Sequence, residues 1–337
     1  MRRSYWGIII LLTLFLGLVL FGLLWRVAEE PKVYRIGILS RGSFYESAVE
    51  GYKAKMKELG YIEGENVEYD IRFITAREEL PKVIREFIAN GVDLIHTYST
   101  PATQAAYQET KNLSHPIPIV FGSMGDPLVS GVVENIQRPG TNVTGGASLS
   151  TELTARRLEL LREINPAIRR VAMPHTAKEA GDAAANKSVE VAKETAQRLG
   201  IELRFYPVRD SEDNKTAAQM ISRRDVEGII VGGDSLIWGV LELYAQRAIK
   251  EKIPLAAFDI SHVQKGALMG FGPDYFVSGE QSAVLTNQIL RGRNPAEIAI
   301  EVPQKLLMIV NLDTAKAIGL EFSEEFLKQV DIIIGGK

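Results

Sequence analysis

The chain has 337 residues, 46% hydrophobic and 24% charged, which provides enough apolar material for two α/β domains and excludes a disordered protein. A formal net charge of −3 gives no basic surface for nucleic acid, so DNA and RNA are not expected as partners. The absence of cysteine excludes disulfides, thiolate metal sites, cysteine nucleophiles and a lipid-modified cysteine, and four scattered histidines argue against a catalytic zinc. We expect no metal and no cofactor.

The N-terminus has the features of a membrane anchor. Arg2 and Arg3 precede an apolar stretch, residues 7–25, whose helix would be about 28 Å long, close to the bilayer core. This stretch does not end in the small residues that precede a signal cleavage site, so we expect an uncleaved transmembrane helix with the remaining chain outside the cytoplasm. The alternative is removal after Ala28, which would leave a free secreted or periplasmic protein. Residues 1–32 are thus the anchor and its tether.

From residue 34 onward, strand and helix patterns alternate, as expected for parallel sheets with helices on both faces. The first predicted strand, Tyr34–Leu39, leads to a helix whose start is indicated by Ser43 and Glu46, which have capping-box spacing. Further strands are predicted at Val67–Phe73 and Asp93–Thr97. This alternation predicts an α/β protein.

The same pattern occurs twice along the chain. Residues 92–121 and 226–258 each consist of a buried strand, a polar turn, an amphipathic helix and an Ile-Pro pair that opens another strand. The repeat predicts two doubly wound parallel-sheet lobes, joined by a multi-strand hinge and preceded by the transmembrane helix. Two similar lobes imply a cleft between them.

Glycines and turn formers in residues 139–146 mark the expected first crossing between lobes. We therefore assign residues 34–146 to lobe 1 and residues 147–258 to lobe 2. The chain is then expected to return over about residues 259–300 and complete lobe 1. Residues 301–337 should lie near the hinge.

One turn facing the predicted cleft is suited to an anion. Ligands of open parallel sheets bind beyond the carboxyl ends of the strands, where successive turns converge. Ser99 and Thr100 precede a helix whose first backbone donors are unpaired, and Ser123 follows the next strand. These hydroxyls could hold a ligand carboxylate. The alternative is that Ser99 or Thr100 only caps the helix.

The corresponding turn of lobe 2 carries Asp234 and Ser235. A carboxylate that faces an anion-binding turn across a cleft would suit a zwitterion, with the ligand ammonium on Asp234. An equally acceptable interpretation is that Asp234 caps the following helix.

Several aromatic residues lie at or near the same turns and could stack on a ligand ring, although each could equally serve in packing. Asp126 is as well suited to fixing a turn, and His175 to a solvated loop. The candidate ligand contacts are Ser43, Phe44, Tyr45, Ser99, Thr100, Ser123, Asp126, His175, Asp234, Ser235 and Trp238.

Common enzyme signatures are missing. The sequence has no Walker motif, and Gly270-Phe-Gly272 lacks the rest of a dinucleotide fingerprint. Gly233-Asp-Ser235 lacks the last glycine of a nucleophile elbow. We therefore expect a binding protein and no catalytic residue.

An ordered series of short motifs spans residues 34–334. These motifs are Gly60-Tyr61, Glu63 to Val67, Ile117 to Phe121, Asp126-Pro127, Gly131, Arg138 to Gly145, Arg157 to Leu161, Ile289 to Gly292, Asn311 and Ala317 to Leu320. Together they resemble the ABC transporter substrate-binding proteins of the tryptophan-binding type. The first turn, Arg41 to Tyr45, lacks the His-Pro pair common in that family.

The resemblance implies a type I periplasmic-binding-protein fold that closes on a small solute and presents it to a membrane permease driven by a separate ATPase. It also implies that Ser99, Thr100, Ser123 and Asp234 face the ligand, and that the ligand is an amino acid, as in the relatives that bind aromatic amino acids. The alternative is a membrane-anchored sensor subunit that signals to a membrane partner. An enzyme acting in the same cleft is a third and weaker hypothesis.

Overall fold

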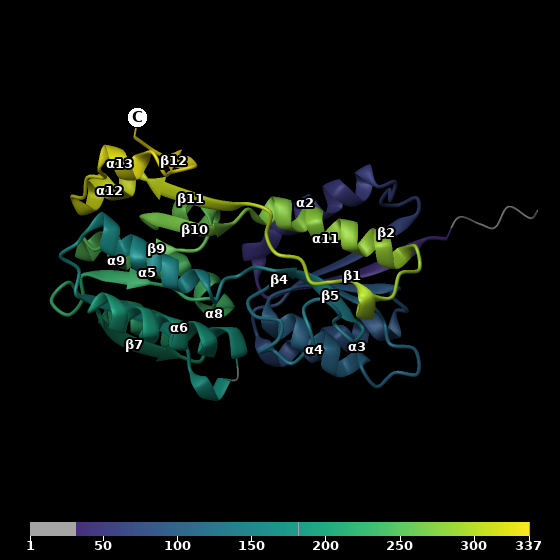
Figure 1. Ribbon diagram of the computed structural model, residues 1–337. Helices are drawn as coiled ribbons and strands as arrows, with labels where there is room; N and C mark the ends of the chain where they lie inside the picture. Colours follow the sequence, from purple (N-terminus) through teal and green to yellow (C-terminus); the bar gives the residue numbers. More distant parts are fainter. Residues whose placement is uncertain (1–31, 181, 337) are drawn as a thin grey trace, which may run out of the picture.

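The computed structural model describes residues 32–180 and 182–336, which form two α/β lobes, each built on its own sheet (Figure 1). Lobe 1 contains a five-stranded sheet in the order β2-β1-β3-β4-β5, and lobe 2 a seven-stranded sheet in the order β12-β11-β10-β9-β8-β6-β7. All strand pairs are parallel except β10 with β11. The predicted fold class of two parallel-sheet lobes is therefore confirmed for the described residues.

Helices cover both faces of the lobe 1 sheet because apolar side chains alternate along its strands. Ile36, Ile38 and Val120 pack towards α2 and α11, whereas Leu39 and Phe121 pack towards α3 and α4 on the opposite face (Figure 1). The elements of this lobe are β1 Tyr34–Ser40, η1 Ser43–Tyr45, α2 Glu46–Glu58, β2 Val67–Phe73, η2 Arg77–Glu79, α3 Leu80–Ala89, β3 Leu94–Tyr98, α4 Thr100–Thr110, β4 Ile119–Met124, β5 Val143–Ala147, α11 Tyr275–Leu290 and η4 Pro295–Glu297.

Lobe 2 begins after β5 and includes the C-terminal strands. Its elements are α5 Leu153–Ile164, β6 Arg170–Thr176, η3 Lys178–Ala180, α6 Ala183–Leu199, β7 Glu202–Val208, α7 Ser211–Met220, β8 Gly228–Ile230, α8 Ser235–Trp238, α9 Leu241–Glu251, β9 Leu255–Ala257, α10 Ile260–Gln264, β10 Met269–Pro273, β11 Leu306–Asn311, α12 Leu312–Ile318, α13 Glu324–Leu327 and β12 Ile332–Ile334.

The course of the chain after residue 258 differs from the sequence prediction. The strand β10 does not return to lobe 1, because Met269 and Gly270 pair with Ala256 and Ala257 of β9 and extend the lobe 2 sheet. Only α11 and η4 return, and β11 and β12 then join the lobe 2 sheet instead of ending at the hinge. The expected return segment, residues 259–300, is therefore divided between the lobes.

The chain crosses between lobes three times, near residues 148–152, 273–275 and 302–305. The first crossing follows β5 directly, and the third lies beside it, since the Ala147 amide donates to the Glu301 carbonyl at 2.8 Å. Much of the segment expected to cross first, residues 139–146, belongs to β5 and its preceding loop. The turn-forming residues of this segment reverse the chain direction before β5, so the chain stays within lobe 1.

The first helix also begins differently from the prediction. Residues Ser43–Tyr45 form a 3₁₀ turn, α2 starts at Glu46, and Ser43 makes no side-chain capping bond. The capping-box prediction was wrong because Phe44 and Tyr45 are buried and their packing sets the path of this loop.

Within residues 32–180 and 182–336, no helix combines the length and apolar character that a membrane span requires. The predicted anchor, residues 7–25, lies outside the described residues.

Candidate ligand-binding site

A small, nearly filled cavity of about 10 Å³ lies between the lobes, at the carboxyl ends of their strands. Both lobes and the first crossing contribute to its wall, which is rich in hydroxyl groups and contains one carboxylate. The residues that line it are Tyr45, Ser99, Thr100, Pro101, Gly125, Ser148, Ser150, Asp182, Ala184, Gly233, Ser235 and Trp238.

The turn before α4 both caps its helix and lines the cavity. The Ser99 hydroxyl accepts a hydrogen bond from the Ala102 amide at 3.3 Å, and the Thr100 hydroxyl accepts one from the Gly125 amide at 3.4 Å. Ser99 has a φ of 93°, in a region that favours glycine. Because a hydroxyl that accepts one bond can still donate its own hydrogen, both side chains remain able to contact a ligand.

Ser123 is placed behind this turn and does not line the cavity. Its carbonyl accepts a hydrogen bond from the Ser99 amide at 3.0 Å, and its residue is only 1% exposed. Ser123 therefore shapes the turn that carries Ser99, and its hydroxyl is not brought to the cavity wall as the sequence predicted.

Asp234 is engaged within lobe 2. Its carboxylate accepts hydrogen bonds from the backbone amide and the hydroxyl of Thr176 and from the amides of Leu236 and Ile237 at the start of α8. These contacts correspond to the capping alternative, and Asp234 is not among the residues that line the cavity. Its neighbour Ser235 does line it.

The carboxylate in the cavity wall is that of Asp182, which the sequence analysis did not single out. Its Oδ1 accepts a hydrogen bond from the Ala185 amide at the start of α6, and the side chain is 2% exposed. Burial and the nearby Asp234 raise the pKa of Asp182 to about 6, while Arg41 and Arg77 act in the opposite direction. Its place just before a helix, in the loop that follows β6, was the available signal.

Arg41 joins the two lobes at this point. Its guanidinium lies 3.6 Å from Oδ2 of Asp182 and donates to the Ser235 hydroxyl at 3.1 Å. The same side chain donates from Nε to the Thr75 carbonyl of lobe 1 at 3.4 Å. A buried cation from lobe 1 thus faces the lobe 2 carboxylate.

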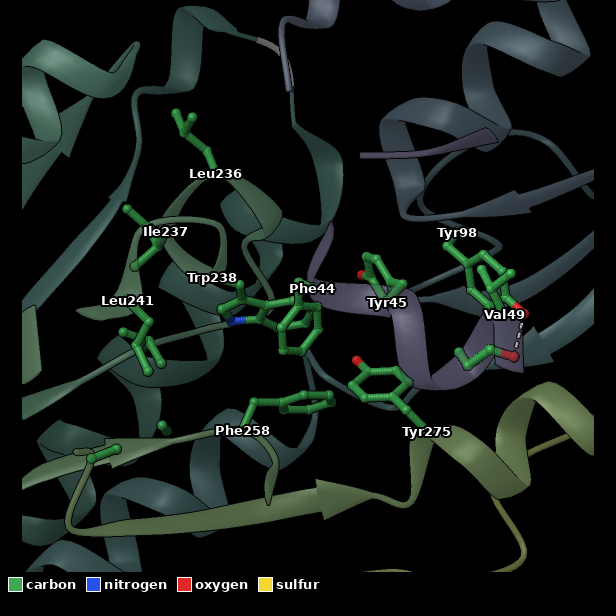
Figure 2. Close-up of a cluster of buried hydrophobic side chains, with 14 of the residues drawn as sticks. Phe44, Tyr45, Val49, Tyr98, Leu236, Ile237, Trp238, Leu241, Phe258 and Tyr275 are labelled. Carbon is green, nitrogen blue, oxygen red and sulfur yellow. Dashed lines mark hydrogen bonds between the residues drawn. The ribbon is translucent and has the colours of Figure 1, made fainter. Parts of the chain in front are cut away.

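Aromatic rings form a continuous cluster beside the cavity (Figure 2). Tyr45 lies 5.5 Å from Tyr98 and 5.3 Å from Tyr275, measured between ring centroids. In lobe 2, Trp238 stacks on Phe258 at 4.6 Å. The predicted aromatic residues Tyr45 and Trp238 line the cavity, and Phe44 lies between the lobes.

A buried arginine supports the crossing that lines the cavity. Arg157 of α5 donates to the carbonyls of Ser150 and Phe271 and lies over the Phe258 ring at 4.9 Å. Burial lowers the pKa of Arg157 to about 9. This side chain fixes Ser150 in the position where it lines the cavity.

Three predicted contacts lie elsewhere. Ser43 is exposed. Asp126 accepts hydrogen bonds from the amides of Leu128 and Val129 and fixes a turn. The His175 ring packs edge-on against Phe205 at 5.6 Å. None of the three lines the cavity.

Among residues 32–180 and 182–336, no three His, Asp or Glu side chains are grouped to bind a metal ion. The chemistry of the cavity is instead that of hydroxyl donors, one carboxylate and aromatic surface, which can bind a small polar molecule with an apolar part.

Comparison with known proteins identifies a matching family model and a related protein. A family model described as ABC transporter substrate binding protein matches residues 32–334. A protein named "Tyrosine-binding protein" from Clostridioides difficile is 28% identical over 303 residues, covering 88% of this chain and 84% of that one.

Two solved structures share the fold. A conserved domain protein from Vibrio cholerae aligns with a TM-score of 0.83 and 26% identity, covering 90% of this chain and all of that one. An ABC domain in complex with L-Trp from Streptococcus pneumonia aligns with a TM-score of 0.80 and 21% identity, covering 89% and 100% of the two chains. The family match over residues 32–334, together with the two-lobed fold, shows that this chain belongs to the ABC transporter substrate-binding protein family.

Proposed function

We propose that this protein binds an amino acid, aromatic in its side chain, in the cavity between the lobes and delivers it to the permease of an ABC importer. The observation that carries the proposal is that the buried Asp182 carboxylate and the hydroxyls of Ser99 and Thr100 share one inter-lobe cavity. Proteins of this family bind solutes and are not enzymes, in agreement with the missing catalytic motifs.

The cavity suits the charged part of an amino acid. The ligand ammonium would pair with Asp182, and its carboxylate would lie at the start of α4, near Ser99 and Thr100, where backbone dipoles favour an anion. The side chain would then extend towards Tyr45 and Trp238. A relative named for tyrosine binding and a fold neighbour in complex with L-Trp support this choice of ligand class.

Closure of the two lobes on the ligand is the proposed mechanism, with the three crossings as the hinge. The proposed location is extracytoplasmic, tied to the membrane by residues 7–25. The sensor alternative would use the same cavity, but the family match favours transport.

Ligand-dependent thermal unfolding of the full chain in detergent tests the proposal. An amino acid at about one hundred times its Kd should add about 2.7 kcal/mol to stability, a shift of about 5 °C. We expect the shift with L-tyrosine, L-phenylalanine or L-tryptophan and not with ribose, inositol or succinate. A shift with sugars alone would refute amino acid binding. The control is Ser43→Ala, which changes an exposed residue outside the cavity and should retain the shift.

A further inference from the structure

Phe44 belongs to lobe 1 but is buried against lobe 2. Its ring stacks on His262 with a centroid distance of 4.4 Å and an interplanar angle of 14°, and lies 5.2 Å from Trp238. The Tyr275 ring meets it edge-on, also at 5.2 Å, and Phe44 is 8% exposed (Figure 2). The ring of Phe44 thus fills an aromatic enclosure next to the cavity.

Arg41, three residues earlier in the same loop, makes the second contact with lobe 2. Its guanidinium faces Asp182 at 3.6 Å and Ser235 at 3.1 Å. The loop therefore presents a cation and an aromatic ring to lobe 2 at the same time. An aromatic amino acid would present the same two kinds of group to lobe 2: its ammonium is a cation, and its side chain is an aromatic ring.

The groups that enclose Phe44 would be better matched by a ring that carries a polar group than by the phenylalanine ring. The His262 ring is fully buried, and its Nδ1 lies 3.3 Å from the Asp259 carboxylate without forming a hydrogen bond of normal geometry. Its Nε2 and the buried hydroxyl of Tyr275, which lies near Ser123, also form no hydrogen bond of normal geometry among the described residues. Figure 2 shows this hydroxyl directed towards Phe44. A phenylalanine ring can satisfy none of these groups, whereas a phenol or an indole carries a polar group that can.

We propose that Phe44 occupies the subsite of the ligand's aromatic ring, so that the loop formed by residues 41–45 competes with an aromatic amino acid for lobe 2. This inference rests on the proposed function and deepens it by assigning the ring subsite and a device that limits access to it. A ligand must move Phe44 out before its own ring enters between His262, Trp238 and Tyr275.

Such competition lowers the apparent affinity by the fraction of molecules in which the subsite is free. If Phe44 occupies the subsite in nine molecules of ten, its removal strengthens binding of an aromatic ligand about tenfold. A small amino acid such as L-alanine does not reach the ring subsite, so its affinity should be insensitive to Phe44.

The test is calorimetric titration of the full chain in detergent with L-tyrosine, L-tryptophan and L-alanine, comparing wild type with Phe44→Ala. We expect the Kd of the aromatic amino acids to fall at least tenfold and that of L-alanine, where binding is measurable, to change less than twofold. The matched control, Phe276→Ala, removes a ring that is 38% exposed on α11 and should change neither. Unchanged or weaker aromatic binding by Phe44→Ala would overturn the proposal, because Phe44 would then be a wall of the site.

A second measurement needs no ligand. The chain has no cysteine, so spin labels can be placed specifically at Gln108→Cys in lobe 1 and Gln197→Cys in lobe 2, both exposed. In the absence of ligand, Phe44→Ala should broaden the distance distribution towards longer values, because the loop no longer holds the lobes together. Identical distributions would overturn the proposal. If neither protein binds any amino acid but the distances differ, the proposed function fails while the contact of Phe44 with lobe 2 is shown to hold the lobes.

Discussion

Gly279 of α11 lies directly against the backbone of Ala48 in α2, so closely that a Cβ atom on Gly279 would overlap the Ala48 carbonyl oxygen. Gly51 of α2 has the same relationship with the Phe276 carbonyl. Because α11 follows β10 of lobe 2, this contact between two helix backbones fixes the second crossing on lobe 1. Small residues at both positions are what permits the approach.

We predict that Gly279→Ala lowers the free energy of unfolding by about 3 kcal/mol, since the added methyl must separate two packed helices. Gly239→Ala is the matched control, because a Cβ atom there would meet its nearest neighbours at ordinary contact distances, 3.5 Å or more. Denaturant unfolding of both variants measures the difference. Equal stabilities would show that the helices separate freely.

Ligand affinity should depend on the ionisation of Asp182. Burial and Asp234 raise its pKa to about 6, and an ammonium group binds the ionised form, so the Kd of the amino acid should rise as the pH falls below about 6. Asp182→Asn should weaken binding at least tenfold at pH 7 and remove this pH dependence. Asp259→Asn is the control for the pH dependence: the Asp259 pKa is also raised to about 6, but this residue lies beside His262 and not in the cavity wall, so the variant should keep the rise in Kd below about pH 6. Titration calorimetry between pH 5 and 8 makes the comparison, and a wild-type Kd that stays flat over this range would contradict the role of Asp182.

The same substitution should increase stability without ligand. A carboxyl whose pKa rises from 3.8 to about 6 on folding binds its proton more tightly in the folded state, so its contribution to stability is present below about pH 4 and is lost as the pH rises to about 6. We expect Asp182→Asn to stabilise the protein by about 1–3 kcal/mol at pH 7 and by little at pH 4. Asparagine retains a good N-cap for α6. Thermal unfolding at the two pH values tests this, and a loss of stability at pH 7 would mean that the pairing of Asp182 with Arg41 outweighs its burial.

Substitution of Asp234, in contrast to that of Asp182, should destabilise the protein. Asp234→Ala leaves the amide and hydroxyl of Thr176 and the start of α8 without their acceptor, and we expect a loss of about 2–3 kcal/mol in chemical denaturation. Ser235→Ala, at the adjacent position in the cavity wall, removes one hydrogen bond from Arg41 and should lower stability by only about 1 kcal/mol, while weakening ligand binding. A stable Asp234→Ala protein with reduced affinity would reverse these assignments.

Ser99 combines a strained backbone with a position in the cavity wall. Ser99→Gly removes the capping hydroxyl but places a glycine at a φ of 93°, so the two effects on stability should cancel to within about 0.5 kcal/mol. The loss of the hydroxyl should weaken amino acid binding by about tenfold. Parallel measurements of the melting temperature and the Kd separate the two properties, and unchanged affinity would assign Ser99 to capping alone.

Local periodicity was sufficient to predict most of lobe 1, because each strand and helix is specified by residues close in the chain. The position of β10 was not predictable in this way, since its partner in lobe 2 is chosen by sheet pairing and not by pattern. Asp182 has the same sequence signal as Asp234, a carboxyl before a helix, and only the fold shows which of the two lines the cavity. The contact of Phe44 with His262 joins residues far apart in the sequence, and no spacing rule predicts it.

Ser148 and Ser150 lie in the first crossing and also line the cavity. A ligand that contacts them would therefore contact a segment of the proposed hinge, whose backbone angles would change if the lobes close as proposed. The free energy of ligand binding can then favour rotation of the lobes directly at the crossing, without a conformational change that passes through either sheet. It follows that substitutions in this short segment should alter affinity and lobe closure together, whereas substitutions in the α4 turn should alter affinity with little effect on the rotation itself.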